Sequence, residues 1–474
     1  MQAQQHSRRT GDGNPWQPLR ARLAALALAA LTSAAGAAGT DASRLGGSLT
    51  PLGAEPGASA DGSVAAWTPI AQPLPGWSHG KPRRDFWRYK DDKPLYTIDE
   101  SSVDKHADKL SPGHVEMLKK IKGYRMEVYP SRRTCAVPDV VAENTKKNVG
   151  FAKLDKDGLA LEEAYLPGTP FPLPSNGVEV MLNMKMRYHG VGFDMPNTMA
   201  AVSPRKGSSD WLKLITDQVA YYPWGGKGGT LFSKVGRVEA YGYYQFSEPA
   251  GMAGQAGIML GKTAEPSEAF YYFPGQRRVR RMPAYSYDAP QLGLDNQYSV
   301  DEIAVFSGQL DRFDWKLIGK RELLVPYNSF ALYDFNAKFD EVALRDFINP
   351  QRMRYEAHRV WVVEATVRAG MRHQAPKRVF YIDEDTWSPL VAVDYDAQGR
   401  VWKVREGHQI PAYEIGSCDV QAFAQYNLID GRYLFDSASV GTGKDHRWLL
   451  EPGSNVRMKA DFYTSENLRA ISER

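Results

Sequence analysis

The sequence predicts a mainly β protein of the α+β class, in which antiparallel strands are accompanied by a few helices. From about Gly177 onwards, apolar and polar residues alternate with a period of two in many short segments. Aromatic residues make up 11% of the chain, with 25 Tyr and 11 Trp, and such residues favour strands and binding surfaces. No stretch alternates strand and helix regularly, as a parallel α/β sheet would require.

The amino terminus predicts a secretory leader. Arg20 and Arg22 precede the apolar run 23–31, and the small residues 35–37 fit the pattern that signal peptidase recognises. A membrane anchor is the competing interpretation, but the run 23–39 is shorter than the roughly 18–20 apolar residues of a spanning helix. No cysteine lies near the cut, so we expect no lipid anchor there. We therefore expect residues 1–37 to be removed and the mature protein to reach the periplasm.

Charge excludes one class of partner. The leader holds four of the 59 basic residues and one of the 55 acidic residues, so the chain without it is close to neutral. A nucleic-acid partner normally requires a basic protein or a basic patch. We expect no nucleic-acid binding.

The order of segments predicts an extended arm followed by one β domain. Residues 38–94 are rich in Gly, Pro, Ala and Ser without a sustained period, and residues 95–474 form the domain with helical insertions. Short helices are predicted after Asp99, after Ser111-Pro112 and from Pro138, because capping residues precede apolar positions with helical spacing.

The strands are predicted from their alternation. In 237–248, one side carries Val238, Ala240, Gly242, Tyr244 and Phe246, and the other side is more polar. Further strands are expected at 358–368, 377–383, 391–395, 400–406, 180–189, 257–261, 269–273, 315–325 and 433–440. Residues 196–230 lack a period, and we expect a loop at 225–229.

Cys135 and Cys418 are the two cysteines of the chain. In an oxidising periplasm they could form a disulfide, and two separate buried thiols are the alternative. The sequence does not decide between these interpretations.

Known catalytic and metal-binding patterns are absent. The sequence contains no HExxH, no cysteine-based metal pattern and no GxSxG, so we expect no metal, no cofactor and no assigned catalytic residue. The acidic run Asp383-Glu384-Asp385 could support acid–base chemistry, although acidic residues after a strand are also ordinary turn formers.

Four arginines cluster at Arg277, Arg278, Arg280 and Arg281, directly after an aromatic run. They could form a rim that binds an anionic headgroup or an acidic partner. The alternative is a solvated strand whose long side chains cover apolar surface. A strand would place Arg278 and Arg280 on the same face.

The order of several segments resembles the bacterial DUF1329 family, which is often described as outer-membrane lipoprotein-sorting-like. The similar stretches include SLTPLGAE, DKPLYTID, YRMEVYPSRRT, GTPFPLPSNGVEVMLN, YYFPGQRRVRRMPAYSYDAP, FDWKLIGKRELLVPYN and KRVFYIDEDTW. The resemblance runs from about Gly46 to Trp402. It implies a LolA/LolB-type fold, in which helices cover the cavity of a curved, unclosed antiparallel sheet. It also implies partners such as a transporter of the RND type and an outer-membrane protein.

An apolar cavity in such a sheet would suit a hydrophobic small molecule or lipid. The candidate lining residues are Tyr244, Phe246, Met259, Phe273, Trp361, Val363 and Phe380. The function expected first is a periplasmic carrier or chaperone for a lipid, a sterol-like compound or a lipidated protein. A periplasmic hydrolase or lyase, and a binding subunit of a transporter assembly, are the alternatives.

Overall fold

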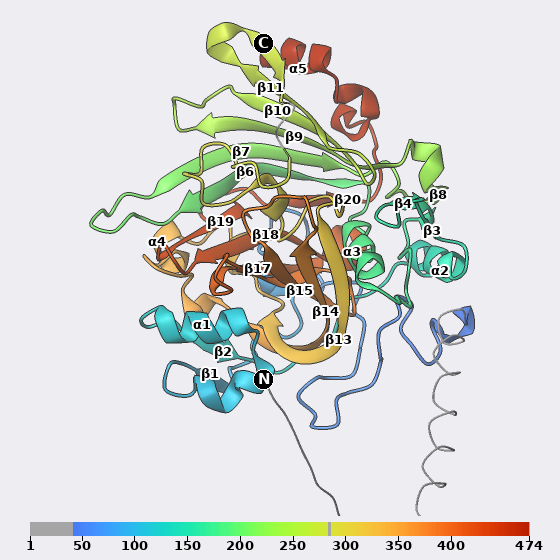
Figure 1. Ribbon diagram of the computed structural model, residues 1–474, viewed down its shortest axis with the longest axis vertical. Helices are drawn as coiled ribbons and strands as arrows, with labels where there is room; N and C mark the ends of the chain where they lie inside the picture. Colours follow the sequence, from blue (N-terminus) through green and yellow to red (C-terminus); the bar gives the residue numbers. More distant parts are fainter. Residues whose placement is uncertain (1–40, 283–285, 474) are drawn as a thin grey trace, which may run out of the picture.

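The computed structural model describes residues 41–282 and 286–473 (Figure 1). The predicted leader lies outside the described residues. Among the described residues, no helix is both long and apolar enough to cross a membrane. Residues 41–95 contain only two short 3-10 helices, η1 (Ala42–Arg44) and η2 (Arg83–Phe86), and run as an irregular segment along the rest of the chain.

One large sheet of sixteen strands forms the body of the protein. Its strands are β1 (Tyr96–Ile98), β2 (Met126–Val128), β6 (Gly192–Val202), β7 (Leu212–Tyr221), β9 (Val238–Glu248), β10 (Ala256–Lys262), β11 (Glu268–Phe273), β12 (Arg278–Arg281), β13 (Phe313–Pro326), β14 (Tyr355–Val367), β15 (Lys377–Asp383), β16 (Pro389–Tyr395), β17 (Val401–Ala412), β18 (Ser417–Asn427), β19 (Arg432–Ala438) and β20 (Arg447–Leu449). Two small sheets pair β3 (Lys153–Leu154) with β4 (Leu161–Glu163), and β5 (Tyr165–Leu166) with β8 (Thr230–Leu231).

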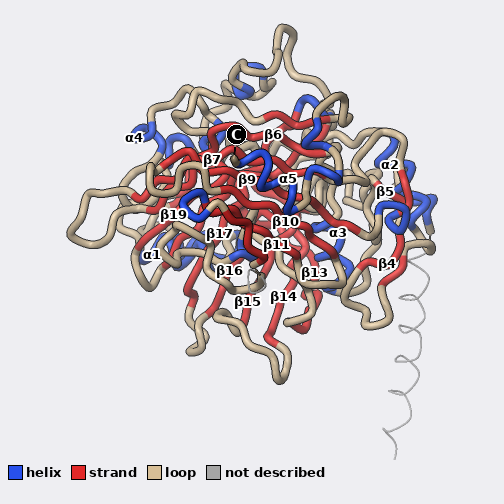
Figure 2. Tube along the Cα trace, turned by 90° about the horizontal axis from the view of Figure 1, so that it is seen from above, coloured by secondary structure: helices blue, strands red, loops and turns tan. Residues whose placement is uncertain are grey.

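The large sheet is curved and unclosed. Its order is β1-β2-β14-β15-β16-β17-β18-β19-β6-β7-β9-β10-β11-β12, with β13 beside β14 and β20 beside β6. All its pairings are antiparallel except the short contact between β14 and β2. The sheet curves strongly, and the strands at the two ends of its order, β1 and β12, do not pair with each other (Figures 1 and 2). The predicted mainly β fold with an unclosed antiparallel sheet is therefore confirmed.

Few helices accompany the sheet. They are α1 (Pro112–Lys120), α2 (Asp139–Asn148), α3 (Gly177–Lys185), α4 (Phe339–Val342), α5 (Ser465–Ser472) and the 3-10 helices η3 (Val103–Lys109), η4 (Phe232–Val235), η5 (Pro274–Gln276), η6 (Val300–Glu302), η7 (Ala331–Tyr333), η8 (Pro350–Arg352), η9 (Tyr413–Ile415), η10 (Val456–Met458) and η11 (Ala460–Phe462). The helix predicted after Ser111 is confirmed as α1, whose first turn is capped when the His114 amide donates to the Ser111 hydroxyl (3.1 Å).

One prediction for local structure is wrong, and one region contains strands that were not predicted. Residues 180–189 were expected to form a strand, but Gly177–Lys185 is α3, which begins where the Asn176 side chain accepts a hydrogen bond from the Glu179 amide. The segment 196–230, for which no strand was predicted because it lacks a period, contains β7 and part of β6. The register of β6 against β7 shifts between Met195 and Thr198, and this irregularity breaks the period of two.

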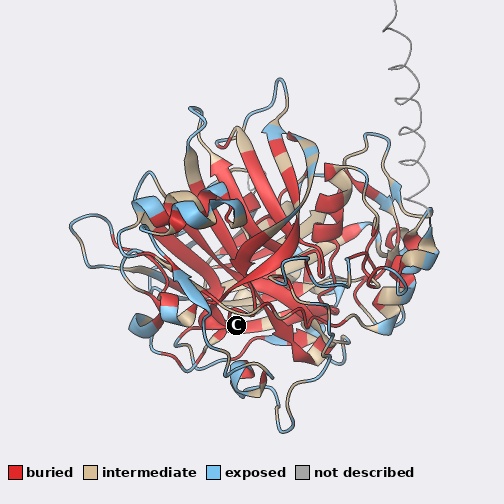
Figure 3. Cartoon of the chain, turned by 90° about the horizontal axis from the view of Figure 1, so that it is seen from below, coloured by how far each residue is buried: buried red, intermediate tan, exposed pale blue. Residues whose placement is uncertain are grey.

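The sheet has an inner face and an outer face. Cross-strand pairs define the inner face, because paired residues point to the same side: Phe380 pairs with Val363, Phe423 with Asp436, and Tyr244 with Gly257. Helix α3 and the segment 286–309 lie on the inner face, while α1 and α5 lie on the outer face against β16–β17 and β10–β12. The strands are mostly buried and the exposed residues concentrate in loops (Figure 3).

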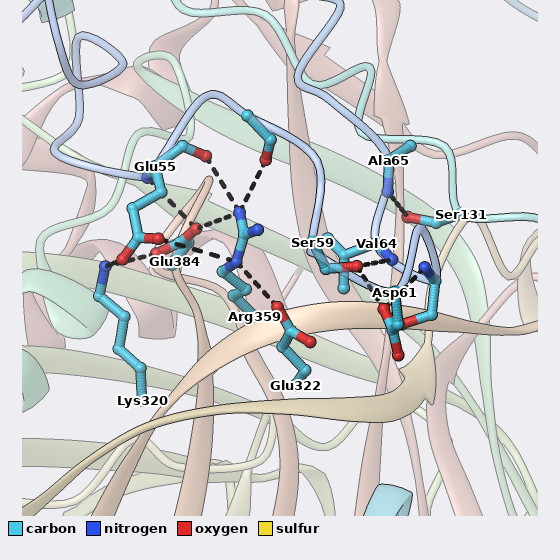
Figure 4. A network of polar contacts seen from close by, with 12 residues as sticks. Glu55, Ser59, Asp61, Val64, Ala65, Ser131, Lys320, Glu322, Arg359 and Glu384 are labelled. Carbon is cyan, nitrogen blue, oxygen red and sulfur yellow. Dashed lines mark hydrogen bonds and ion pairs between the residues drawn. The ribbon is translucent and has the colours of Figure 1, made fainter.

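The amino-terminal segment is attached by charged contacts as well as by apolar ones. Glu55 binds Lys320 (2.8 Å), and Lys320 also binds the buried Glu384 (2.7 Å) (Figure 4). Arg359 donates to the Gly57 carbonyl (2.9 Å) from β14. Because these contacts join positions that are hundreds of residues apart, they fix the segment along the edge of the sheet.

A second attachment centres on Arg83, which is 3% exposed. Its guanidinium makes two hydrogen bonds of 2.8 Å to the Glu414 carboxylate and stacks over the Trp448 ring (4.8 Å). Burial alone would raise the pKa of Glu414, but the attraction of Arg83 outweighs it and lowers the pKa to about 2. The pair is therefore charged over the whole neutral and mildly acidic range.

Acid should weaken this attachment. Because the pKa of Glu414 is lower in the folded than in the unfolded chain, its ionised form stabilises the folded state fully at pH values above the unfolded pKa of about 4.5. This contribution is lost as the pH falls through the folded pKa of about 2. We expect the free energy of unfolding to fall by roughly 2 kcal/mol between pH 4.5 and pH 2 from this group alone. Urea titrations of the natural chain and of Glu414→Gln measure it. A Glu414→Gln chain whose stability declines as steeply over that interval would contradict the assignment.

Cys135 and Cys418 form a disulfide in the structure, with an S–S distance of 2.11 Å and a Cα–Cα distance of 5.3 Å. The bond joins the segment before α2 to the beginning of β18, and the two cysteines are 283 residues apart in the sequence. Both residues are buried. Of the two alternatives left open by the sequence, the structure contains the disulfide.

Candidate functional site

Two adjoining cavities lie on the inner face beneath β6, β7, β9 and β10. The Lys185 cavity, of about 210 Å³, and the Tyr298 cavity, of about 170 Å³, are named after one lining residue each. They share five lining residues: Phe193, Ala220, Gly242, Met259 and Ile303. The two cavities are thus neighbours along one stretch of sheet.

The sequence of these strands explains why space remains there. Gly242, Gly257 and Gly261 lie on neighbouring strands of the inner face, where larger side chains would fill the space. A Cβ at Gly257 would lie 2.4 Å from the Tyr244 ring, so this ring lies flat against the glycine backbone. At Gly242 a Cβ would meet only the Met259 Cβ, at 3.9 Å, so the position opens into the cavities.

The segment 286–309 forms the opposite wall. It contributes Leu292, Leu294 and Ile303, which face the strands across the cavities. Apolar side chains also dominate the strand side of the Tyr298 cavity. A ligand placed there would exchange water for hydrocarbon on both sides, which favours binding of an apolar chain.

Buried ion pairs hold this wall on the sheet. Asp301 binds Arg378 of β15 (2.6 Å), and Glu302 binds Lys403 of β17 (3.0 Å). Burial would raise the pKa of Asp301, but Arg378 and His373 lower it, so the carboxylate is ionised. Losing one partner of such a buried pair is strongly destabilising. The wall is therefore a fixed part of the fold.

One end of the Lys185 cavity is polar. Lys185 donates to the Gly308 carbonyl (2.7 Å) and pairs with Glu239 (3.0 Å). Arg187 donates to the Val420 carbonyl (3.1 Å), whereas its Nε has no hydrogen-bond partner among the described residues and lies 3.5 Å from Asp419. Two cations, each also beside an acid (Glu239 and Asp419), give this end hydrogen-bond donors for the polar head of a ligand whose hydrocarbon tail lies in the apolar part.

His189 belongs to the same end. Its Nδ1 lies 3.0 Å from the Asp419 carboxylate, and its ring stacks on Tyr222 with centroids 4.4 Å apart. Burial lowers the pKa of His189, against the opposing effect of Asp419. Lys185, Arg187 and His189 were not singled out from the sequence. Their spacing of two was the available signal, but Lys185 is the last residue of α3 and the other two follow this helix, where a strand was expected.

The seven predicted lining residues all lie on the inner face, but the structure separates them. Tyr244, Phe246 and Met259 line the Tyr298 cavity, and Met259 also lines the Lys185 cavity. The other four do not line these cavities: Phe273 packs against Tyr271, Trp361 against Trp387, Val363 against α3, and Phe380 against Phe306. The backbone of α3 at Gly177 approaches Val363, and the Phe306 ring of the segment 286–309 lies against Phe380. Ligand contact by any of the seven remains a prediction.

The arginine cluster lies at the free edge of the sheet. Arg278, Arg280 and Arg281 are exposed on β12, whereas Arg277 lies in the preceding turn with a positive φ of 49°. Arg280 lies opposite Tyr271 and Arg278 opposite Phe273 in the neighbouring strand, so the two arginines share one face as predicted, and this is the inner face. Arg281 lies on the outer face and approaches Glu268 (3.7 Å). The rim role of the four remains a prediction.

The acidic run 383–385 is buried. Burial raises the pKa of Asp383 to about 6, with Asp385 adding to the effect, and burial raises the pKa of Glu384 to about 7 against the attraction of Lys320. Asp385 makes two hydrogen bonds with the Arg133 guanidinium, of 2.7 and 2.8 Å. None of the three carboxylates lines the Lys185 or Tyr298 cavity. The neighbouring Arg132 also binds an acid, Asp92 (2.9 Å).

A larger cavity, of about 310 Å³, lies between the amino-terminal segment and η7. Charged side chains surround it, among them Arg83, Lys90, Arg352, Arg354 and Asp334. Removing such groups from water would cost free energy that a hydrocarbon could not recover. It is therefore the poorer candidate for a hydrophobic ligand, despite its size.

Comparison with known proteins gives a clear result at the level of sequence. The family described as "Protein of unknown function (DUF1329)" matches residues 97–469. An uncharacterized protein of Pseudomonas aeruginosa is 37% identical over 430 residues, covering 86% of this chain and 90% of the relative. The resemblance stated from the sequence is thereby confirmed.

Solved structures with partial similarity include a putative outer membrane lipoprotein-sorting protein domain from Vibrio parahaemolyticus. It is 16% identical, covers 62% of this chain and 98% of its own, and has a TM-score of 0.42. A DUF1329 family protein from Desulfovibrio piger is 17% identical, with coverages of 61% and 98% and a TM-score of 0.39. A LolA superfamily protein from Nitrosomonas europaea has a TM-score of 0.33 at 12% identity, with coverages of 61% and 98%.

Proposed function

This chain belongs to the DUF1329 family, and we propose that it is a periplasmic carrier that binds an elongated hydrophobic ligand on the inner face of its sheet. The observation that carries the proposal is the pair of adjoining cavities, which share Gly242 and Met259 in their lining. Burying a methylene contributes about 0.8 kcal/mol, so a sixteen-carbon chain in open water forgoes roughly 13 kcal/mol. A carrier must supply an enclosed apolar surface of this kind.

The polar end of the Lys185 cavity supports a more specific ligand class. A fatty acid could place its carboxylate near Lys185 and Arg187 and extend its chain towards Met259 and Phe246. The Nε of Arg187 has no hydrogen-bond partner among the described residues and lies 3.5 Å from Asp419, so it is a donor to which such a carboxylate could offer a hydrogen bond. A sterol-like compound or a lipidated protein would use the apolar walls and leave this donor unsatisfied.

Periplasmic location and transport partners are also part of the proposal. The predicted leader supports export, and the predicted loss of residues 1–37 would leave a nearly neutral chain. The exposed edge strand β12, with its arginines, is a suitable place for an acidic partner. A transporter of the RND type and an outer-membrane protein are the proposed partners.

Native mass spectrometry tests the proposed binding. Exported protein, incubated with a sixteen-carbon fatty acid, should carry one ligand per chain. A protein that stays ligand-free with fatty acid and with sterol would exclude the carrier function.

The arginine rim predicts a kinetic effect. Replacing Arg278 and Arg280 together by Glu should slow the uptake of an anionic fatty-acid probe several-fold at low salt, because steering by exposed charges is electrostatic. Stopped-flow fluorescence at low and high ionic strength measures it, and the difference should shrink at high salt. A neutral probe is the control. Equal slowing of both probes, at all salt concentrations, would contradict a role of charge.

An enzyme remains the alternative from another class. It would have to use the run 383–385, whose carboxylates are buried and bound to Arg133, Lys320 and neighbouring hydroxyls. No cavity of substrate size described above reaches them. The geometry therefore favours the carrier.

A further inference from the structure

Three side chains from two neighbouring strands meet beneath the amino-terminal segment. His358 of β14 and Asp383 and Asp385, at and just after the end of β15, each offer one ligand atom, and these atoms lie within 4.8 Å of one another. His358 and Asp383 are 0% exposed and Asp385 is 4% exposed. Among the described residues, no other group of three histidine, cysteine or acidic side chains meets this way.

The hydrogen bonds leave two acceptors of this group unsatisfied. The Nε2 of His358 lies 3.1 Å from the Glu356 carboxylate. A neutral imidazole would donate a hydrogen bond to this carboxylate from Nε2–H. The Nδ1 of His358 would then carry a lone pair, and it has no hydrogen-bond partner among the described residues. The Oδ1 of Asp383 also has none. Buried polar atoms are rarely left without a partner.

Charge balance singles out the same carboxylate. Asp385 pairs with Arg133 (2.7 Å), Glu384 with Lys320 (2.7 Å), and Glu356 with Arg354. Asp383 receives hydrogen bonds from two hydroxyls only, those of Thr386 (2.6 Å) and Tyr327 (3.1 Å). No lysine or arginine of the described chain forms an ion pair with it. A buried carboxylate in this situation needs a cation or a proton.

We propose that His358, Asp383 and Asp385 form a binding site for a divalent transition-metal cation such as Zn²⁺ or Mn²⁺. One imidazole nitrogen with carboxylate oxygens is a donor set that suits both ions. Glu356 orients His358 from behind, as carboxylates commonly do for metal-binding histidines. The ring of Tyr327 stacks on His358 with centroids 3.5 Å apart and holds it in place.

The position of the site suggests a structural role. Arg133, which binds Asp385, also donates to the carbonyl groups of Glu55 (2.7 Å) and Ala65 (3.1 Å) in the amino-terminal segment. The cation would therefore stabilise the junction of β14 and β15 on which this segment lies. The metal site is separate from the Lys185 and Tyr298 cavities, because His358, Asp383 and Asp385 do not line either cavity.

Elemental analysis of protein exported and purified without chelators tests the site. We expect about one Zn²⁺ or Mn²⁺ per chain, a lower Tm after dialysis against EDTA, and recovery of the Tm when that metal is added back. Asp383→Asn keeps the size of the side chain and should lower the bound metal at least tenfold. His358→Gln should do the same, and it decides the matter if Asp383→Asn fails to fold.

Asp436→Asn is the matched control. Asp436 is also a buried carboxylate bonded to a tyrosine hydroxyl, from Tyr298, and burial raises its pKa, but it has no histidine beside it. This variant should retain the full metal content. The proposal is overturned if the natural chain holds less than about a tenth of an equivalent of metal and its Tm does not change when Zn²⁺ or Mn²⁺ is added. It is also overturned if Asp383→Asn and His358→Gln bind metal as the natural chain does.

Discussion

Gly242→Leu should abolish high-affinity binding of a fatty-acid probe while the protein stays folded. Gly242 lines both cavities on the inner face, so a leucine side chain there would occupy the space where they adjoin. Its Cβ meets only the Met259 Cβ, at 3.9 Å, so the fold can accept it. The position lies in β9, where glycine is a weak strand former. We expect the Kd to rise at least tenfold, about 1.4 kcal/mol, in a fluorescence titration.

Gly251→Leu is the control for this substitution. Gly251 lies in the turn between β9 and β10, and a Cβ there meets nothing within 4 Å. The control should bind the probe as the natural chain does. If Gly242→Leu binds equally well, with unchanged circular dichroism, the ligand does not occupy these cavities.

Removing the disulfide should destabilise the protein by a large amount. The bond closes a loop of 283 residues, and cross-linking distant positions lowers the conformational entropy of the unfolded chain. We expect the double variant Cys135→Ser, Cys418→Ser to lose roughly 2–5 kcal/mol of unfolding free energy in urea titrations. The loss should be larger than that of any surface substitution, which usually stays within about 0.5 kcal/mol.

A reductant distinguishes the effect of losing the disulfide bond from the effect of replacing the two cysteine side chains. Dithiothreitol should lower the stability of the natural chain towards that of the double variant, and it should leave the double variant unchanged. If the natural chain remains as stable in reductant as without it, while mass spectrometry confirms free thiols, the bond does not stabilise the fold.

The sequence predicted many strands from their alternation, but it missed β6, β7 and β18. The alternation of Val238, Ala240, Gly242, Tyr244 and Phe246 correctly identified the apolar side of β9, which faces the cavities. In β6 the alternation fails around Asn197, whose φ is 52°, and the strand was missed. The positive φ at Asn197 and the register shift thus hid this strand from the local pattern.

The candidate site was predicted in part, because its walls are brought together by contacts distant in sequence. Tyr244, Phe246 and Met259 line the cavities, but Phe380 is covered by Phe306 of the segment 286–309. Where that segment lies depends on buried ion pairs such as Asp301–Arg378, which no local pattern reveals. The metal-binding group depends in the same way on the register of β14 against β15, which pairs Val360 with Asp383.

A structure determined with a sixteen-carbon fatty acid tests the central claim most directly. We expect density for one hydrocarbon chain between Met259 and Ile303, with the carboxylate near Lys185 and Arg187. Density for the chain in the charged cavity beside Arg83, or two cavities that remain empty at saturating fatty acid, would contradict it.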